Sequence, residues 1–368
     1  MQKTAIVIVD NDLSTDQRVH KTCLTLQKCG YWVVELGRLL PESLPLERPY
    51  FVLRKKLHFR SGPLFYAELN IRFFFYLLSA NVDLIFANDL DTLPAAFLAA
   101  KLRNKKLIYD THEYFTETPE IARRPIIKAI WGFIENNTFP YLENVITVNE
   151  SIAKLYSDKY HKKIKVCRNI PLSKKPTNLI TKSDLGIPEN HKIILYQGAL
   201  NIGRGLEWML NAMPLIENAT LLIIGDGDIS EQLKNQTINL QIEDKVIFLG
   251  KIDTTKLINY TQLADIGLCL LENNGLNYYH ALPNRVFDYL YAGVPILATR
   301  FPEISNIVET YKTGKLIDCY EPIYLAQITN DMLINQINIS HFPEITNELS
   351  WENEEKVLIN VINSANQD

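Results

Sequence analysis

Short apolar runs rich in β-branched residues alternate with longer segments of helical period along most of the chain. Such runs predict buried strands, and the periodic segments between them predict helices. The predicted strands are Ala5–Val9, Trp32–Leu36, Leu84–Ala87, Lys106–Tyr109, Val145–Val148, Ile164–Cys167, Lys192–Gln197, Leu221–Gly225, Val246–Leu249, Ile266–Leu270 and Pro295–Ala298. The clearest helices are Gln17–Cys29, Pro94–Leu102 and Pro125–Asn136. This alternation predicts an α/β fold of two Rossmann-like, doubly wound parallel-sheet domains facing a central cleft.

A polar segment with two prolines, Pro171–Asn178, separates the two series of strands and is typical of a linker. We therefore expect one Rossmann-like domain over residues 1–172 and a second over residues 173–345. The remaining residues, 346–368, contain Ser350 followed by glutamates and an apolar period, which predicts a capped amphipathic helix. We expect this helix to return toward the first domain.

The composition is typical of a soluble globular protein, with 47% hydrophobic and 22% charged residues. A net charge of −4 argues against a nucleic-acid-binding protein, and the spacing of the five cysteines matches no zinc or redox motif. The first residues lack the pattern of a signal peptide. The most apolar stretch, Phe73–Ala87, is too short for a membrane span. We expect a cytoplasmic protein.

Two glycine-containing loops follow predicted strands in the second half. In Tyr196–Glu207, Gly198 and the later glycines allow close backbone approach to a phosphate, and Arg204 supplies a cation suited to phosphate oxygens. A simple turn with Arg204 in solvent is the alternative. The second loop, Ile224–Asp228, contains Asp226 but lacks the third glycine of a dinucleotide-binding motif.

A third motif, Gly275–Ala298, combines a polar loop with a helix predicted to start near Pro283. Asn284 and Arg285 then lie in the first turn, which favours anions. Asp288 follows one turn later on the same face, where its carboxylate can accept hydrogen bonds from two neighbouring hydroxyls, as on a ribose. The alternative is an ordinary buried helix.

Together these segments resemble glycosyltransferase family 4, which has the GT-B fold. The resemblance rests on the loop around Gly198 and Arg204, on Leu282–Tyr289, and on the turns at Thr299–Val308 and Thr313–Ile317. It covers nearly the whole chain and is more specific in the second half. It implies a retaining, metal-independent transfer of a sugar from a nucleotide diphosphate sugar, with acceptor binding in the first domain and donor binding in the second. No metal or other cofactor is expected.

The resemblance also implies roles for individual donor-site residues. Arg204 and Arg285 would contact the diphosphate, and Asp288 would contact the ribose. Family members carry an acidic residue eight positions before Asp288, where this chain has His280, so His280 is a candidate substitute contact to the sugar. Ala199 stands where many members have an arginine, and Arg285 can compensate.

The first half carries polar clusters at three predicted strand ends. In Tyr109–Phe115, resemblance places His112 beside the reacting sugar with Glu113 near it; the alternative is a turn in which Asp110 caps a helix. Asp89 and Asp91 are candidates for acceptor hydroxyls, although Asp91 can equally cap a helix.

The third of these clusters is the first loop, Asp10–Val19, which lies where acceptors approach in this fold. Asp16 or Arg18 can contact the acceptor there, and pairing at the surface is the preferred alternative.

Cations and aromatic residues are combined in three further segments, Arg54–Arg60, Arg72–Tyr76 and Arg123–Trp131. Such surfaces suit an anionic membrane face. The alternative is a core helix with solvated ends, which is the preferred interpretation for Phe73–Tyr76. The resemblance implies a transferase of cell-surface polysaccharide synthesis that acts on a glycan or lipid-linked acceptor, and we expect these segments to contact the inner face of the plasma membrane peripherally. Two alternatives stay open: a sugar-nucleotide 2-epimerase of the same architecture, and a non-catalytic nucleotide-sugar-binding protein.

Overall fold

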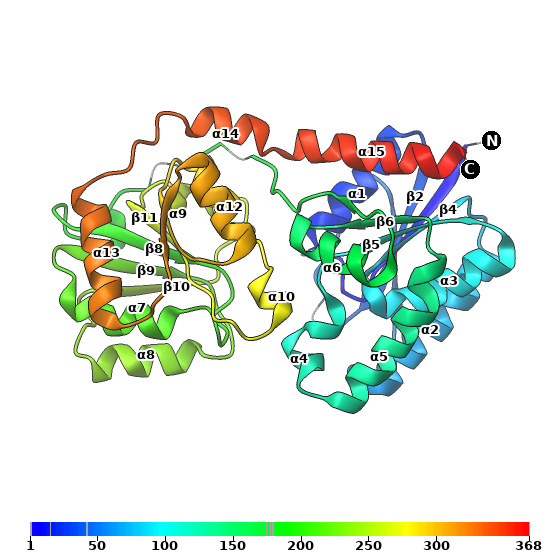
Figure 1. Cartoon of the computed structure of the whole chain (residues 1–368), viewed down its shortest axis with the longest axis horizontal. Helices are drawn as coiled ribbons and strands as arrows, with labels where there is room; N and C mark the ends of the chain where they lie inside the picture. Colours follow the sequence, from blue (N-terminus) through cyan, green and yellow to red (C-terminus); the bar gives the residue numbers. More distant parts are fainter. Residues whose placement is uncertain are drawn as a thin grey trace. The chain divides into compact units, whose positions relative to one another are not determined.

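The computed structural model describes residues 2–14, 16–41, 43–173, 175–176, 178 and 180–367. Thr15 of the first loop, and Lys174 and Thr177 of the predicted linker, lie outside the described residues. The chain divides into two compact units, Met1–Asn169 with Trp351–Asp368, and Ile170–Ser350 (Figure 1). The sequence had predicted that the first domain ends at residue 172 and the second at residue 345.

The first unit contains a seven-stranded parallel sheet of order β3-β2-β1-β4-β5-β6-β7. Its strands are β1 (Thr4–Ile8), β2 (Trp32–Leu39), β3 (Phe51–Lys56), β4 (Leu84–Asn88), β5 (Lys106–Thr111), β6 (Asn144–Thr147) and β7 (Lys165–Val166). Its helices are α1 (Gln17–Lys28), α2 (Gly62–Ser79), α3 (Asp89–Arg103), α4 (Pro119–Ala122), α5 (Pro125–Thr138), α6 (Glu150–Tyr160) and α15 (Trp351–Gln367), with 3-10 turns at Phe115–Glu117 and Phe139–Tyr141.

The period of two along β1 separates two cores in this unit. Ile6 and Ile8 pack into a cluster with apolar residues of α2, α3, α5 and α6. Ala5 and Val7 pack into another cluster with residues of α1 and α15. Because successive side chains of a strand point to opposite faces, helices cover both faces of the sheet, as buried parallel strands require.

The last helix, α15, is tied to α1 by side-chain contacts. Glu355 accepts hydrogen bonds from Thr25 and Lys28, at 2.8 Å each. The Lys21 ammonium lies 4.3 Å from the centre of the Trp351 ring. Glu354 accepts from the backbone N–H of Arg168, so the helix also holds the chain at the end of β7.

The second unit contains a six-stranded parallel sheet of order β10-β9-β8-β11-β12-β13. Its strands are β8 (Lys192–Gln197), β9 (Ala219–Ile224), β10 (Val246–Gly250), β11 (Ile266–Cys269), β12 (Ile296–Thr299) and β13 (Gly314–Ile317). Its helices are α7 (Leu206–Ala212), α8 (Ser230–Asn239), α9 (Ile258–Thr261), α10 (Leu276–Tyr279), α11 (Arg285–Tyr291), α12 (Pro302–Tyr311), α13 (Pro322–Ile334) and α14 (Phe342–Glu348), with 3-10 turns at Ser183–Leu185 and Met213–Leu215. The prediction of two parallel-sheet α/β domains is confirmed.

Three elements differ from the prediction. Strands β3 and β13 were missed, because each is short and carries lysines or arginine among its apolar residues. Helix α3 begins at Asp89 rather than Pro94, so a proline lies inside the helix. The side chain of Asn70 on α2 makes this possible, because it donates to the Asp91 carbonyl at 2.7 Å and accepts from the Ala95 N–H at 3.0 Å. In a regular helix the Ala95 N–H would donate to the Asp91 carbonyl. The Asn70 side chain gives each of these two groups a partner instead.

Candidate active site

The loop after β8 has a backbone that requires glycine. Gly198 has φ +135° and its N–H donates to the Ile224 carbonyl at 2.9 Å. A Cβ on Gly225 would lie 1.8 Å from the Gly198 carbonyl oxygen, so the loops after β8 and β9 are in direct backbone contact. This contact with the neighbouring loop fixes the shape of the glycine-rich loop, and the close approach of a phosphate to it stays a prediction.

Arg285 lies against this loop at the start of α11. Its guanidinium carbon is 4.4 Å from the centre of the Tyr196 ring, and a Cβ on Gly198 would be 3.4 Å from its Nη2 atom. The side chain is only 8% exposed, and Nη1 has no hydrogen-bond partner among the described residues. A buried donor without a partner is costly, so this N–H is a candidate for an anionic ligand.

Arg204 has a similar arrangement on the loop before α7. Its guanidinium carbon lies 5.0 Å from the Tyr278 ring centre, and its buried Nε has no hydrogen-bond partner among the described residues. Burial raises the pKa of the Cys269 thiol, whereas the charges of Arg285 and Arg204 both lower it. Each arginine contacts a tyrosine from the sequence segment that carries the other arginine, Tyr278 for Arg204 and Tyr196 for Arg285.

Asp288 is connected to the end of β8 through a buried amide. Gln197 donates to an Asp288 carboxylate oxygen at 3.0 Å and accepts from the Thr261 hydroxyl at 2.8 Å. Asp288 is half-buried, and its amide partner fixes the carboxylate beside the Gly198 loop. Sequence reasoning missed Gln197, although a glutamine at the end of an apolar strand is an unusual residue and a usable signal.

The other predicted donor-site residues are more peripheral. Asp226 is exposed and accepts from the Gly227 N–H and the Ser230 hydroxyl, so its carboxylate stabilises the turn before α8. Asn284 precedes α11 and is exposed, without a side-chain capping bond. His280 ends α10 and is half-buried; burial lowers its pKa, whereas the nearby charge of Glu303 raises it.

In the first unit, a buried ion pair joins α1 to the end of β5. Arg18 donates from Nε and Nη2 to the two oxygens of Asp110, at 2.9 and 2.7 Å, and from Nη1 to the Cys167 carbonyl at 2.9 Å. Their side chains are 4% and 1% exposed. The preferred expectation that Arg18 pairs at the surface is wrong, and so is the alternative that Asp110 caps a helix. Burial raises the pKa of Asp110, but the charges of Arg18 and His112 outweigh this effect and lower the pKa to about 2.

His112 lies between two carboxylates. Its Nδ1 is 3.0 Å from Asp89 Oδ2 and its Nε2 is 3.3 Å from Asp110 Oδ2, while its backbone N–H donates to Asp89 Oδ1 at 2.8 Å. Carboxylates only accept, so a ring facing one at each nitrogen is stabilised with both nitrogens protonated. Burial lowers the pKa of His112, but Asp89 and Asp110 outweigh it and raise this pKa well above its ordinary value.

Asp89, at the start of α3, has φ +59°, a conformation that is strained for a residue with a side chain. Both of its carboxylate oxygens face His112. Asp91 is 6% exposed and hydrogen-bonded to Asp10 at the end of β1. Burial, and then the charges of Asp10 and Asp89, raise the pKa of Asp91 well above its usual value. Because two carboxyl groups can bond only through a proton, Asp91 is the protonated partner.

The remaining predicted acceptor residues lie at the edge of this cluster. Asp16 is the N-cap of α1; it accepts from the Val19 N–H at 2.9 Å and from Asn11 at 2.6 Å. Glu113 is exposed. Sequence reasoning missed the pairing of Arg18 with Asp110, because these two residues are 92 positions apart in the chain.

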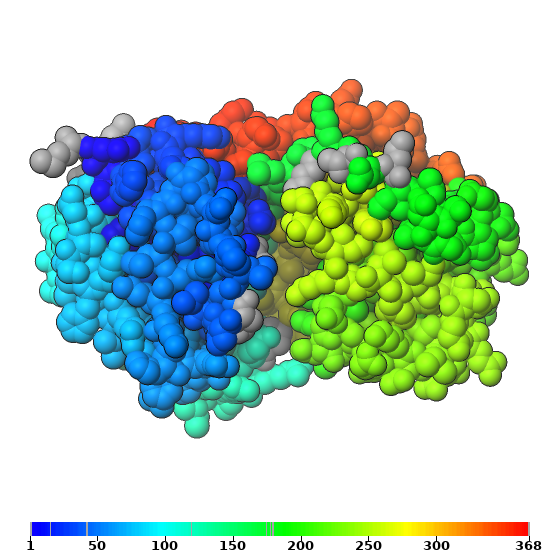
Figure 2. All heavy atoms as spheres, turned by 180° about the vertical axis from the view of Figure 1, so that it is seen from behind, coloured from blue at the N-terminus to red at the C-terminus, as the bar shows by residue number. Residues whose placement is uncertain are grey.

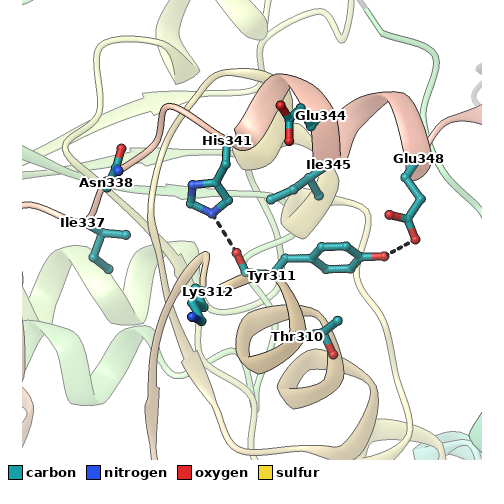
Figure 3. A pocket seen from close by; sticks show the side chains of 9 residues that line it. All are labelled: Thr310, Tyr311, Lys312, Ile337, Asn338, His341, Glu344, Ile345 and Glu348. Atoms are coloured by element: carbon teal, nitrogen blue, oxygen red, sulfur yellow. Dashed lines mark hydrogen bonds between the residues drawn. The ribbon is translucent and has the colours of Figure 1, made fainter.

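A separate polar hollow of about 570 Å³ lies between the end of α12 and α14 (Figure 3). His341 contacts the Tyr311 carbonyl oxygen at 2.8 Å, and the Tyr311 hydroxyl donates to Glu348 at 2.6 Å. These bonds hold the two helices together. Among the described residues that line this hollow, none belongs to the predicted site.

The described part of the chain shows neither a metal-binding cluster nor a membrane-spanning helix. No group of three or more histidine, cysteine, aspartate or glutamate side chains has an arrangement suited to a metal ion. No helix there has both the length and the apolar character needed to cross a bilayer.

The second unit matches a known family model. Residues 179–347 match the family described as glycosyl transferases group 1, a stretch of less than half of the chain. Over 225 residues, the chain is 26% identical to alpha-monoglucosyldiacylglycerol synthase of Streptococcus pneumoniae, covering 56% of this chain and 48% of that protein. The chain spans about half the length of the curated relatives it matches.

Solved structures resemble the whole chain. A sucrose-phosphate synthase from Thermosynechococcus elongatus has a TM-score of 0.81 at 17% identity, with 99% of each chain covered. HepE of Anabaena, in complex with UDP-glucose, has a TM-score of 0.75 at 15% identity, with 98% of this chain and 99% of that chain covered. At such identities the likeness shows the fold. The chain therefore has the GT-B fold of two Rossmann-like domains, and its second unit matches the group 1 glycosyl transferases.

Proposed function

We propose that the chain is a retaining, metal-independent glycosyltransferase that binds a nucleotide diphosphate sugar in its second unit. The observation that carries this proposal is the pair Arg204 and Arg285, each stacked on a tyrosine and each with a buried N–H that lacks a protein partner among the described residues. Guanidinium groups bind phosphate oxygens with strong, charge-assisted hydrogen bonds. The match of residues 179–347 to group 1 glycosyl transferases supports the same assignment.

Asp288 is the proposed ribose ligand. Its carboxylate is fixed by Gln197 beside the loop that carries Gly198, and a carboxylate can accept hydrogen bonds from two vicinal hydroxyls. His280 is the proposed contact to the donor sugar, in the position where family 4 members have an acid. Asp226 and Asn284, both exposed, are proposed to contact the outer part of the donor.

In the proposed reaction, the bond between the anomeric carbon and the β-phosphate oxygen breaks, and a bond to an acceptor oxygen forms on the same face. The acceptor proton goes to the departing diphosphate, so positioning and charge stabilisation are the contributions of the protein. Protonated His112, held by Asp89 and Asp110, is proposed to stabilise negative charge beside the reacting sugar.

The proposed acceptor is a glycan or lipid-linked sugar of the cell surface. Its hydroxyls would meet the first unit near Asp16, Asp89, Asp91 and Glu113. The relative from Streptococcus pneumoniae is a diacylglycerol glycoside synthase by its name, which supports a lipid-linked acceptor.

A transfer assay tests this proposal. The full chain is incubated with UDP-glucose or GDP-mannose, with and without an acceptor extract from bacterial membranes. Sugar attached to the acceptor supports the proposal, whereas epimerised donor without acceptor supports the 2-epimerase alternative. Donor binding without any turnover supports a binding protein. His112→Ala should reduce transfer more than it reduces donor binding; equal losses would argue against a place beside the reacting bond.

We also propose that α5 contacts the inner membrane face. Ile126, Ile130 and Phe133 recur at helical spacing and are 77%, 53% and 70% exposed, and exposed Arg123 and Arg124 precede the helix. An apolar face beside cations favours binding to anionic lipids. In a flotation assay with phosphatidylglycerol vesicles, Phe133→Glu should reduce binding. Ile238→Glu, at an exposed position of α8, should leave it unchanged.

A further inference from the structure

A groove of about 880 Å³ opens at the carboxyl ends of β2 and β3 in the first unit. It lies in the segment drawn in blue in Figure 2. Four cations line it, namely Arg38, Lys56, Arg60 and Arg72. Its apolar lining comes from Leu39, Leu40, Leu57 and Phe59. No acidic side chain is among the described residues that line it.

The carboxylate of Glu68 on α2 is bonded to one of these cations and to the backbone after β3. Glu68 accepts from the backbone N–H groups of His58 and Phe59, at 2.8 and 3.0 Å, and pairs with Arg72 Nε at 2.8 Å. Although desolvation works in the opposite direction, these bonds lower the pKa of Glu68 to about 2. Glu68 therefore shapes the turn between β3 and α2 and neutralises Arg72, and Arg38, Lys56 and Arg60 are the other cations among the described lining residues.

Arg38 connects the groove with the polar cluster of the site. Its guanidinium carbon lies 4.8 Å from the centre of the Phe65 ring, and its buried Nε has no hydrogen-bond partner among the described residues. Its backbone N–H donates to the carbonyl of Asn11 at 2.9 Å, so Arg38 lies beside the loop that carries Asp10, the hydrogen-bond partner of Asp91. Arg38 thus lines the groove and is bonded through its backbone to the loop after β1.

The groove combines a phosphate-binding character with an apolar floor. Arginine matches phosphate oxygens with paired N–H groups, and lysine adds a mobile charge. Phe59 and Leu57 provide surface for a hydrocarbon chain beside the charges. The volume is within the range of pockets that hold small molecules.

We propose that this groove binds the phosphate or diphosphate group of the acceptor, with the adjoining hydrocarbon chain on Leu57 and Phe59. The acceptor class is then an amphiphilic sugar phosphate or diphosphate, and Arg38, Lys56 and Arg60 set its specificity. This inference rests on the proposed transferase function and names the acceptor class of the same site.

Titration calorimetry on the full chain with three probes tests the groove: farnesyl diphosphate, sodium pyrophosphate and farnesol. We expect farnesyl diphosphate to bind more tightly than either of the others, and binding to weaken as salt is added. Lys56→Gln and Arg60→Gln should each weaken it about five- to tenfold. Lys55→Gln is the matched control, since this neighbour faces Tyr76 at 5.2 Å and does not line the groove; it should change affinity less than about twofold.

The inference is overturned if farnesyl diphosphate binds no better than farnesol, or if the Lys55 and Lys56 variants lose affinity equally. It is also overturned if phosphatidylglycerol vesicles bind through Lys56 and Arg60 while the soluble diphosphate does not, because the surface would then recognise a membrane. UDP-glucose and GDP-mannose are titrated into the same proteins. If a donor binds but farnesyl diphosphate does not, only the inference about the groove is overturned. If neither donor binds, the proposed function is contradicted.

Discussion

Arg18 on α1 and Asp110 at the end of β5 form a two-pronged ion pair that is almost fully buried. The same Asp110 oxygen that accepts from Arg18 Nε lies 3.3 Å from His112 Nε2. Arg18 therefore acts on the candidate active site through Asp110, without needing to contact a substrate. This is a positioning role, different from the acceptor contact that its place in the first loop suggested.

The pair should be strongly coupled in stability. Arg18→Met leaves a buried carboxylate without its partner and should cost about 3–5 kcal/mol of unfolding free energy. The double variant Arg18→Met/Asp110→Leu should lose much less than the sum of the two single variants, because neither charge is then left alone. Urea denaturation of all four proteins measures this coupling. Additive losses would show that the two side chains do not depend on each other.

The charge of His112 should make its stabilising effect depend on pH. Its folded-state pKa is raised above the unfolded value of about 6.5. The stability that it contributes is therefore fully present below pH 6.5 and is lost as the pH rises through the folded-state pKa. Wild type should exceed His112→Phe by more at pH 6 than at pH 9.5, measured by urea denaturation. A difference that stays constant or grows with pH would show that the ring is not held as a cation.

Glu35 in β2 should destabilise the protein at neutral pH. It is fully buried, and burial raises its pKa to about 7, although the charge of Arg48 and a hydrogen bond with Tyr50 act in the opposite direction. Because this folded-state pKa lies above the unfolded one, stability falls as the pH rises from about 4.5 to 7. Glu35→Gln should gain about 2–3 kcal/mol over wild type at pH 8 and much less at pH 5. Equal differences at the two pH values would contradict this.

Much of the fold follows from local patterns in the sequence. Alternating apolar runs and helical segments predicted eleven of the strands, because parallel strands buried on both faces carry continuous apolar residues. β3 could not be found in this way, since its Arg54, Lys55 and Lys56 suit an edge strand with polar surroundings. The true start of α3 depended on Asn70, whose side chain replaces the bonds disrupted by Pro94. A local sequence pattern cannot predict such a contact, because Asn70 is more than 20 residues from Asp91 and Ala95 in the chain.

In the candidate site, too, local patterns could be found from the sequence, whereas contacts between distant residues could not. The loop glycines, Arg204, Arg285 and Asp288 each lie in a segment with its own recognisable pattern, so the sequence could single them out as donor-site candidates. Each of the two arginines stacks on a tyrosine from the other arginine's segment, Arg204 on Tyr278 and Arg285 on Tyr196. These contacts between segments became visible only in three dimensions. Arg18 was misjudged for the same reason, because its partner is 92 residues away.

The contact between the loops after β8 and β9 gives a test of loop shape. Gly225 has φ +144°, and a Cβ there would lie 1.8 Å from the Gly198 oxygen. Gly225→Ala should therefore displace the Gly198 loop and lower both thermal stability and donor affinity. Gly132→Ala is the control, because a Cβ at this position of α5 meets nothing within 4 Å. It should stabilise the helix by about 0.5–1 kcal/mol and leave donor affinity unchanged. Equal effects of the two variants would refute this view of the loop.

Donor binding by the two stacked arginines is the central claim, and calorimetry with UDP-glucose and GDP-mannose tests it most directly. One of these donors should bind, and Arg204→Ala and Arg285→Ala should each weaken its binding by about 1.5–3 kcal/mol, the range for hydrogen bonds to charged groups. Arg300→Ala is the matched control in the same unit, because this exposed arginine pairs with Glu309 and Asp318. It should leave the affinity unchanged. Affinity that is the same in all three variants would contradict the assignment of Arg204 and Arg285 to the diphosphate.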